Sequence, residues 1–406
     1  MTPISEGAPA TTRVDDTRAR ANVVRLALAQ ALTGANSAVI FATGSIAGWM
    51  MAPAPDYATV PLSMYVLGLA AGTLPTGAIS RRFGRRVAFL IGTGFGAITG
   101  VTGCVAILHN SFLLFCLATF AGGLYGAVSQ SYRFAAADGV SAGFRPKAVS
   151  FVLAGGVFAG LLGPQIVQWT MKVWPNYLFA FSYLVQAGIA LVAMAVVAGV
   201  DAPRPPPADL HGGRALLTII RQKRFIGAAL CGVIVYPLMN LVMTSAPLAM
   251  SLCGLSVDDS NSGIQWHIVA MYAPSFFTGS LIARFGAPRI VAVGLVLEAC
   301  AAVIGLSGLT AGHFWGTLAV LGVGWNFGFV GASALVLETH RPEERNKVQA
   351  FNDFLVFGMM ALGSFVSGQL LTDYGWTMVN LVVFPPVVLG LVVVVLLARQ
   401  RAGEHH

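Results

Sequence analysis

Residues 76–84 read TGAISRRFG, and residues 278–286 read TGSLIARFG. Gly77 of the first copy corresponds to Gly279 of the second, 202 residues later in a chain of 406. Each copy comes at the end of a long apolar stretch, so the duplication extends beyond the short segment itself. A membrane segment that recurs at half the chain length predicts two related helix bundles.

The composition excludes a soluble globular protein. Hydrophobic residues make up 56% of the chain and charged residues only 10%, with a mean hydropathy of +0.76, whereas soluble domains average about 25% charged residues. Lipid must therefore cover most of the surface. The five cysteines lie in or beside apolar stretches without a C-x-x-C pair, so we interpret them as small packing residues and predict neither a metal site nor a cofactor.

Twelve stretches of roughly 20 or more apolar residues, the length that crosses a bilayer as a helix, can be placed along the chain. The prediction is an all-α membrane protein whose twelve transmembrane helices form two six-helix bundles related by pseudo-two-fold symmetry. Its parts are a disordered tail (1–22), an N-terminal bundle (23–200), a linker (201–224), a C-terminal bundle (225–398) and a short tail (399–406). The expected spans are 23–50, 58–80, 87–108, 111–138, 148–171, 177–200, 225–250, 263–283, 289–310, 313–337, 350–372 and 376–398.

The basic residues supply an independent test of these spans, because Lys and Arg accumulate in cytoplasmic loops. With the N-terminus placed inside, 23 of the 24 Lys and Arg fall in cytoplasmic segments, and Lys172 falls outside. We therefore expect both termini in the cytoplasm of a bacterial cell, with the chain in the inner membrane. The net charge of +8 then reflects topology and contact with anionic lipid, and it gives no reason to expect nucleic acid as a partner.

The loop between spans 2 and 3 resembles the signature of the major facilitator superfamily, approximately G-x-L-A-D-R-x-G-R-R. The matching residues are Gly77, Ile79, Ser80, Arg82, Gly84, Arg85 and Arg86. Arg81 stands where the family has an aspartate, and Ala283 does so in the second copy. The resemblance covers about residues 22–400 and implies two bundles that transport a solute by alternating access.

In that family the loop latches the two halves together in one state. Because the aspartate is missing here, the latch must use other acidic residues. Asp138 at the end of span 4 and Asp353 at the start of span 11 are the candidate partners for Arg81, Arg82 or Arg85. The alternative is that such ion pairs only orient the helices.

Span 5 partly matches a glycine-proline motif that many exporters of the family show. The residues are Gly155, Gly156, Gly160, Gly163 and Pro164, but the closing glycine pair is absent. Small residues four positions apart also let helices approach closely, so packing between the moving halves is the alternative interpretation.

The resemblance implies that spans 1, 4, 7 and 10 line a central chamber, and polar or aromatic residues fall within these spans. We predict a substrate-binding set of Asn36, Gln130, Arg133, Tyr236, Asn240, Trp325 and Asn326. Aromatic faces and neutral amides suit a planar, mostly uncharged ligand. For any single amide, a role in joining helices is the alternative.

Three titratable residues within the spans have competing interpretations. Arg133 can bind substrate or take part in coupling, or it can pair with Asp138 or extend to the inner membrane face. His267 near the start of span 8 can act in coupling, since imidazole titrates near neutral pH, or can simply lie at the membrane interface beside Trp266. Glu298 in span 9 has no evident partner in the sequence.

The sequence lacks a phosphate-binding loop, an H-E-x-x-H helix and a G-x-S-x-G elbow, so an integral-membrane enzyme is a weak alternative. We expect a monomeric secondary transporter of a small organic solute, with protons as the coupling ion. Residues 132–138 and 265–267 resemble a bacterial branch of the superfamily that includes riboflavin importers. This resemblance implies uptake of a planar vitamin, and the alternative is multidrug or metabolite efflux by proton antiport.

Overall fold

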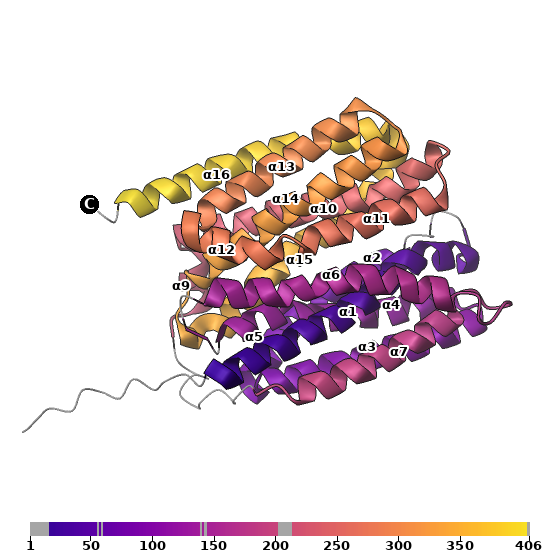
Figure 1. Ribbon diagram of the computed structural model, residues 1–406, viewed down its shortest axis with the longest axis horizontal. Coiled ribbons are helices and arrows are strands. Elements are labelled where there is room, and N and C mark those ends of the chain that lie inside the picture. The colour runs from indigo at the N-terminus through magenta and orange to yellow at the C-terminus, as the bar shows by residue number, and fades with distance from the viewer. Residues whose placement is uncertain are drawn as a thin grey trace, which may run out of the picture.

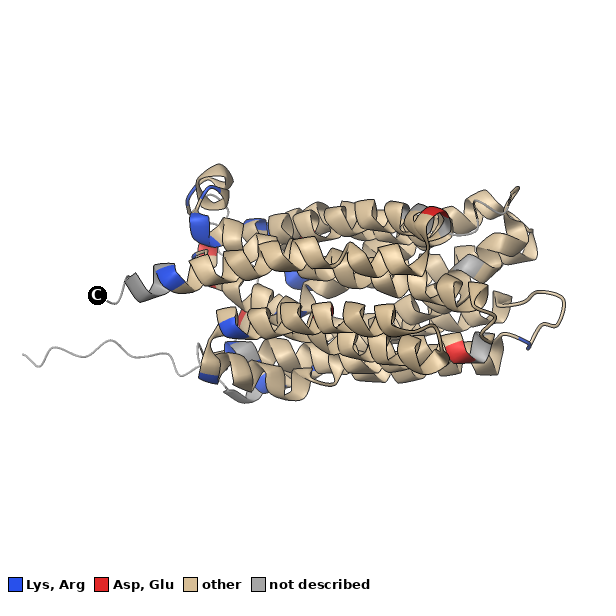
Figure 2. Cartoon of the chain, turned by 90° about the horizontal axis from the view of Figure 1, so that it is seen from above, with Lys and Arg blue, Asp and Glu red and all other residues tan. Residues whose placement is uncertain are grey.

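The computed structural model describes residues 16–54, 57, 60–138, 140, 141, 144–201 and 213–403 (Figure 1). Within these ranges the chain is helical apart from turns and short connections, and contains no strand, which confirms the all-α prediction. Helix α1 begins and α16 ends at the same end of the bundle. Figure 2 shows that most Lys and Arg gather there, and we call it the basic end. The predicted tails and linker lie partly outside the described residues.

Among the described residues, the first half contains seven helices. They are α1 (Asp16–Met51), α2 (Val60–Phe83), α3 (Arg85–Leu108), α4 (Phe112–Gln130), α5 (Tyr132–Asp138), α6 (Arg145–Thr170) and α7 (Ala180–Ala198). Helix α1 starts at Asp16, several residues before the expected start at 23. The expected fourth span is divided into α4 and α5 at Ser131, whose hydroxyl donates to the Val128 carbonyl at 2.7 Å. Such back-bonding by serine competes with the helical ladder.

The second half follows the short helix α9 (Leu216–Ile220). It contains α10 (Lys223–Leu252), α11 (Val257–Tyr272), α12 (Ser275–Phe285), α13 (Ala287–Ser307), α14 (Ala311–Leu337), the 3₁₀ turn η2 (Pro342–Glu344), α15 (Arg345–Leu381) and α16 (Phe384–Gly403). The expected eighth span is divided into α11 and α12 just before Ser275, because Pro274 has no N–H to continue the ladder. Within α15, Gly375 leaves helical geometry with φ 77°, so the boundary between the last two expected spans is a kink.

Eleven helical stretches of the described residues are long and apolar enough to cross a membrane. The expected eleventh span, residues 350–372, lies within α15. This part of α15 carries Asn352 and Asp353, which are buried inside the protein. The polar residues of this span therefore face the protein interior and not the lipid.

The repeat in the sequence is a repeat in the backbone. Gly84 ends the first copy with φ 91° and ψ 158°, and Gly286 ends the second with φ 84° and ψ 147°. Each glycine N–H donates to the carbonyl four residues earlier, at 3.0 Å to Ser80 and 2.9 Å to Ile282. A positive φ of this size strains residues other than glycine, which explains why both copies end in Gly.

The two halves meet along two seams that correspond to each other under the repeat. Helix α2 packs on α15, and α6 packs on α11 and α12. The glycines of α6 serve both bundles, because a Cβ at Gly155 or Gly163 would overlap α1, and one at Gly156 or Gly160 would overlap α11. The small-residue pattern of span 5 is therefore a packing surface for two helices at once.

Candidate functional site

A buried ion pair joins the halves near the basic end. Nη2 of Arg133 on α5 lies 2.8 Å from Oδ1 of Asp353 on α15. Arg133 also donates from Nη1 to Oε1 of Gln130 at 2.6 Å, and Asn352 donates to the same Asp353 oxygen at 3.2 Å. Arg133 is 1% exposed. The partner of Arg133 is thus Asp353 across the interface, in place of the alternative partner Asp138 within its own half.

Two aromatic rings enclose the Arg133 guanidinium. Its Cζ lies 4.4 Å from the ring centroid of Phe134 and 4.7 Å from that of Phe329 on α14. A cation over an aromatic face is attracted by the ring quadrupole, and the attraction grows when water is excluded. Phe329 comes from the second half, so both the carboxylate and one ring that hold Arg133 lie across the interface.

Asp138 takes part in a second polar contact between the halves. Its carboxylate lies 2.7 Å from Nε of Arg85 and 3.6 Å from Nη1 of Arg345 on α15. Arg85 also donates to Oε1 of Gln349 on α15 at 3.2 Å. Of the predicted gating arginines, Arg85 is buried within this group. Arg81 and Arg82 are exposed at the basic end.

The repeated segment contributes a close backbone approach at the same seam. A Cβ at Gly77 would overlap the side chain of Ala350 and crowd the carbonyl of Asn346. The first glycine of the repeated segment therefore permits α2 and α15 to touch where the polar contacts form. Closure at the basic end combines this apolar contact with the two ion-paired groups.

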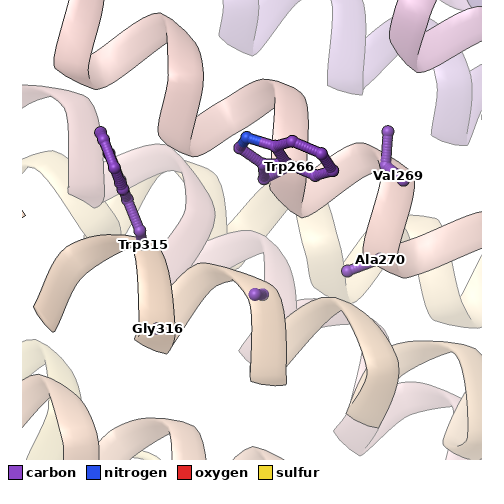
Figure 3. A pocket seen from close by; sticks show the side chains of 6 residues that line it. Trp266, Val269, Ala270, Trp315 and Gly316 are labelled. Carbon is purple, nitrogen blue, oxygen red and sulfur yellow. The ribbon is translucent and has the colours of Figure 1, made fainter. Parts of the chain in front are cut away.

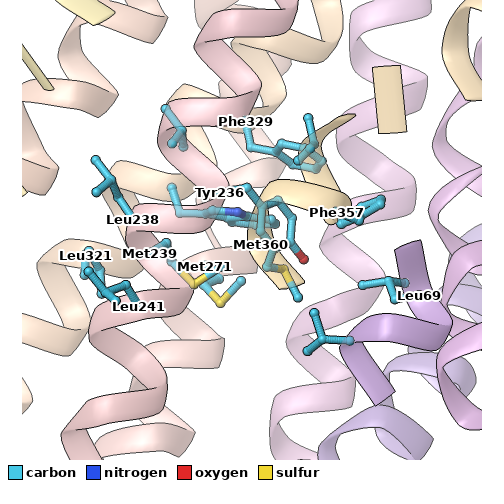
Figure 4. Close-up of a cluster of buried hydrophobic side chains, with 14 of the residues drawn as sticks. Leu69, Tyr236, Leu238, Met239, Leu241, Met271, Leu321, Phe329, Phe357 and Met360 are labelled. Atoms are coloured by element: carbon cyan, nitrogen blue, oxygen red, sulfur yellow. The ribbon is translucent and has the colours of Figure 1, made fainter. Parts of the chain in front are cut away.

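An aromatic cluster lies in the second half, next to the ion pair. Tyr236 on α10 has its ring centroid 5.3 Å from Trp325, 4.9 Å from Phe329 and 5.2 Å from Phe357, each edge to face. Trp325 stacks on Phe329 with centroids 5.0 Å apart and planes at 21°. Figure 4 shows Phe329, Phe357 and Met360 gathered around Tyr236, with Leu69 of α2 nearby. The sequence singled out Tyr236 and Trp325 but missed both phenylalanines.

Three buried polar side chains on the expected chamber helices have unused hydrogen-bonding groups. Neither atom of the Asn36 amide has a hydrogen-bond partner among the described residues, and the same holds for Nδ2 of Asn240 and Nε1 of Trp325. All three residues are 1% exposed. A buried polar group without a partner costs free energy, so these groups are positioned to gain from a polar ligand.

Asn326 belongs to a different arrangement. Its Nδ2 donates to the Met271 carbonyl and to the Ser275 hydroxyl, both at 2.6 Å, and its Oδ1 accepts from Thr278 at 2.7 Å. These bonds satisfy backbone and hydroxyl groups where Pro274 interrupts the helix between α11 and α12. The Asn326 amide is therefore committed to joining helices, which was the alternative considered for these amides.

His267 and Glu298 are both fully buried. The Nδ1 atom of His267 lies 2.6 Å from the Leu318 carbonyl of α14, so the residue packs inside the second half and not at the membrane interface. Both carboxyl oxygens of Glu298 lack a hydrogen-bond partner within the described residues. Its side chain packs against Gly324, where a Cβ would lie 3.1 Å from the Glu298 Cγ.

A hollow of about 400 Å³ lies outside the predicted chamber, between α11 and α14. Figure 3 shows the indoles of Trp266 and Trp315 at this hollow, and its other lining residues are Val269, Ala270, Gly316 and Ala319. Trp266 is 61% exposed, and the lining offers almost no polar group. This surface suits contact with lipid tails, whereas the aromatic cluster around Tyr236 is filled by its own side chains.

The linker is held by a contact that the sequence did not reveal. Glu344 in η2 accepts from the Arg214 backbone N–H, Nε and Nη2 at 2.7, 2.8 and 2.7 Å, and from the Arg341 N–H at 2.9 Å. These donors favour the charged carboxylate and lower the pKa of Glu344 to about 2. The end of the linker is thereby fixed to the turn between α14 and α15.

Comparison with known proteins gives a consistent result. A family model described as Major Facilitator Superfamily matches residues 26–273 and 228–406. The chain is 47% identical over 392 residues to the riboflavin transporter RfnT of Brucella anthropi, which covers 96% of this chain and 98% of that protein. It is 29% identical over 385 residues to the uncharacterized MFS-type transporter YddS of Bacillus subtilis, covering 88% and 86%.

Two solved structures share the fold. The proton:xylose symporter XylE bound to 6-bromo-6-deoxy-D-glucose has a TM-score of 0.76 at 18% identity, covering 93% of this chain and 95% of that one. The human organic anion transporter MFSD10 has a TM-score of 0.72 at 14% identity, covering 93% and 99%. At these identities the similarity concerns the fold.

Proposed function

The chain belongs to the major facilitator superfamily, and on that premise we propose that it takes up riboflavin across the bacterial inner membrane by alternating access, driven by protons. The observation that carries the substrate is the 47% identity to a riboflavin transporter over nearly the full length of both proteins. A relationship of this extent includes every helix that borders the chamber.

The chemistry of the candidate site supports this substrate. Riboflavin has a planar ring system with carbonyl and N–H groups and a polyhydroxyl side chain. Trp325, whose ring face is covered by Phe329 in this state, supplies an aromatic surface for stacking, and the unpaired groups of Asn36 and Asn240 offer hydrogen bonds. Aromatic walls with a few placed polar groups are what such a ligand requires.

The distribution of charge supports the orientation. Lys and Arg gather at the end where α1 begins and α16 ends (Figure 2), and basic residues accumulate on the cytoplasmic side. We assign the basic end to the cytoplasm, with both termini there. The contacts of Arg133 and Gly77 with α15 then close the chamber toward the cytoplasm, which is the state expected of an importer before it releases its substrate.

The test is accumulation of labelled riboflavin in proteoliposomes of known protein orientation under an imposed pH gradient. Wild-type protein should accumulate riboflavin against its concentration gradient when the outside is acidic, and dissipating the pH gradient should abolish accumulation. Riboflavin levels that never exceed equilibration would contradict the proposal. Expulsion of unrelated lipophilic cations under the same conditions would favour efflux instead.

A matched pair of variants connects this activity to the site. Trp325→Phe keeps a ring in the aromatic cluster but removes the unpaired indole N–H, and should raise the riboflavin KM. Trp315, at the other end of α14, has an indole N–H that donates to the Asp259 carbonyl of α11. Trp315→Phe removes this N–H and should leave the KM unchanged. Equal effects of the two substitutions would place the ligand elsewhere.

A further inference from the structure

Phe329 belongs to two groups of side chains that otherwise come from different parts of the molecule. The Phe329 ring contacts the Arg133 guanidinium, whose Cζ lies 4.7 Å from the ring centroid. The same ring also packs on the rings of Trp325 and Tyr236, with centroid distances of 5.0 and 4.9 Å. A single ring on α14 therefore contacts both the ion pair between the halves and the aromatic cluster of the chamber.

The hydrogen bonds of Arg133 do not fully compensate its buried charge, so the adjacent Phe329 ring matters to its stability. The guanidinium is buried, it donates to Asp353 and Gln130, and its Nε has no hydrogen-bond partner among the described residues. A desolvated cation with an unused donor gains from the negative faces of adjacent rings. Removing Phe329 from its position would leave one side of this charge without compensation.

The second helix of the ion pair also reaches the aromatic cluster. Asp353 and Phe357 lie four residues apart on α15 and so share one face of that helix. Asp353 binds Arg133, while Phe357 packs its ring on Tyr236 at 5.2 Å. The ion pair and the cluster are thus two sides of one packed unit.

In this unit the rings leave no room for a planar ligand. Trp325 and Phe329 are 1% and 2% exposed, and they stack on each other. A ligand that stacks on the Trp325 face now covered by Phe329 must take the position that Phe329 holds, because one ring face accepts one stacking partner. Close packing transmits such a displacement to neighbouring side chains.

We propose that Phe329 couples the occupied chamber to the cytoplasmic gate: a planar ligand that stacks on Trp325 displaces the Phe329 ring from Arg133 and so weakens the Arg133–Asp353 ion pair. This inference rests on the proposed uptake of riboflavin. Binding energy from the ligand then favours the state that opens toward the cytoplasm, because only in the closed state does Phe329 stabilise the guanidinium.

The experiment measures opening at the gate with Ala350→Cys, in protein whose five native cysteines are replaced. Position 350 contacts Gly77 across the closed seam, so its reaction with a water-soluble maleimide reports separation of α2 from α15. In the otherwise unchanged protein, riboflavin should accelerate labelling several-fold. With Phe329→Leu, labelling without ligand should already be several-fold faster, and riboflavin should add less than twofold.

Phe327→Leu is the matched control, since Phe327 lies two residues away on α14 and packs on Phe277 of α12 at 6.3 Å. It should behave as the parent protein. A fluorinated phenylalanine at position 329 keeps the ring and weakens its negative face, so it should also accelerate labelling without ligand. Parent-like labelling of both position-329 proteins would overturn the proposal. If the parent protein binds no riboflavin, the proposed substrate fails, while the difference between positions 329 and 327 without ligand still tests the contact with Arg133.

Discussion

Arg133 on α5 and Asp353 on α15 form an ion pair of 2.8 Å that is buried between the two halves. Taking both charges out of water is costly, and the Coulomb attraction offsets this cost only while the partners remain together. The pair is therefore a poor source of overall stability but a sensitive link between the halves. When they separate at this end, each charge must regain water or another partner.

Asp353→Asn should favour opening at the basic end. The substitution leaves the Arg133 charge buried without its carboxylate, and removing one partner of a buried pair costs about 3–5 kcal/mol. Because that cost falls on the closed state, the amides of α15 near residue 353 should exchange hydrogen faster than in the wild type. Unchanged exchange would show that the pair does not hold this seam.

The double substitution Arg133→Gln with Asp353→Asn is the control for that experiment. It removes both charges, so no uncompensated charge remains in the closed state. Hydrogen exchange should return toward the wild-type rate, although transport need not recover. Exchange in the double variant as fast as in Asp353→Asn alone would mean that the lost charge pair is not the cause.

Gly77→Val should prevent closure of the same seam by a steric route. A Cβ at position 77 would overlap Ala350, so the two helices must move apart. Riboflavin uptake should fall at least tenfold while the protein remains folded in detergent. Gly188→Val on α7 is the control, since a Cβ there meets nothing within 4 Å. Wild-type uptake by the Gly77 variant would contradict the contact.

Two asparagines should respond differently to replacement by alanine. Asn240→Ala should weaken riboflavin binding by about 1 kcal/mol, or roughly fivefold in Kd, with little change in thermal stability, because its Nδ2 has no partner within the described structure. Asn326→Ala should lower thermal stability, because three hydrogen bonds at the α11–α12 junction are lost. Ligand fluorescence and thermal unfolding distinguish the two, and a reversed pattern would refute both assignments.

The Arg214–Glu344 contact should fail in acid. The folded pKa of Glu344 is about 2, below its ordinary value of 4.5, so the contact contributes full stability above pH 4.5 and loses it as the pH falls toward 2. Proteolysis of the linker, measured over this range with an acid-stable protease, should accelerate below pH 4.5. Glu344→Gln should remove most of this pH dependence, and a linker whose cleavage is independent of pH would contradict the assignment.

Glu298 and Glu344 provide a matched pair of buried carboxyls. Glu298→Met should leave thermal stability unchanged or raise it, because its oxygens have no partner among the described residues and the thioether fits an apolar site. Glu344→Met should destabilise the protein by about 1–3 kcal/mol, because four hydrogen bonds are lost. A large loss of stability in the Glu298 variant would reveal a partner.

The fold was predictable because it depends on features that are local in sequence. Apolar length defines the spans, and the turn that needs glycine at 84 needs it again at 286. The partner of Asp353 was not predictable, because it depends on how α15 is rotated and shifted against α5. Hydropathy also did not show that Ser131 and Pro274 interrupt spans 4 and 8. Residue type suggested that Asn326 binds substrate. Its side chain instead bonds to residues on both sides of the break between α11 and α12, and the sequence did not show this break.

Alternating access between the two halves is tested by a pair of spin-label distances in the same protein. Labels at Arg86 and Arg289, which are exposed at the basic end of each half, report on the cytoplasmic side. Labels at His109 and Thr310, exposed at the opposite end, report on the outer side. With riboflavin at acidic pH, the first distance should lengthen as the second shortens. Distances that both stay constant, or that lengthen together, in protein that binds riboflavin would contradict alternating access between these two halves.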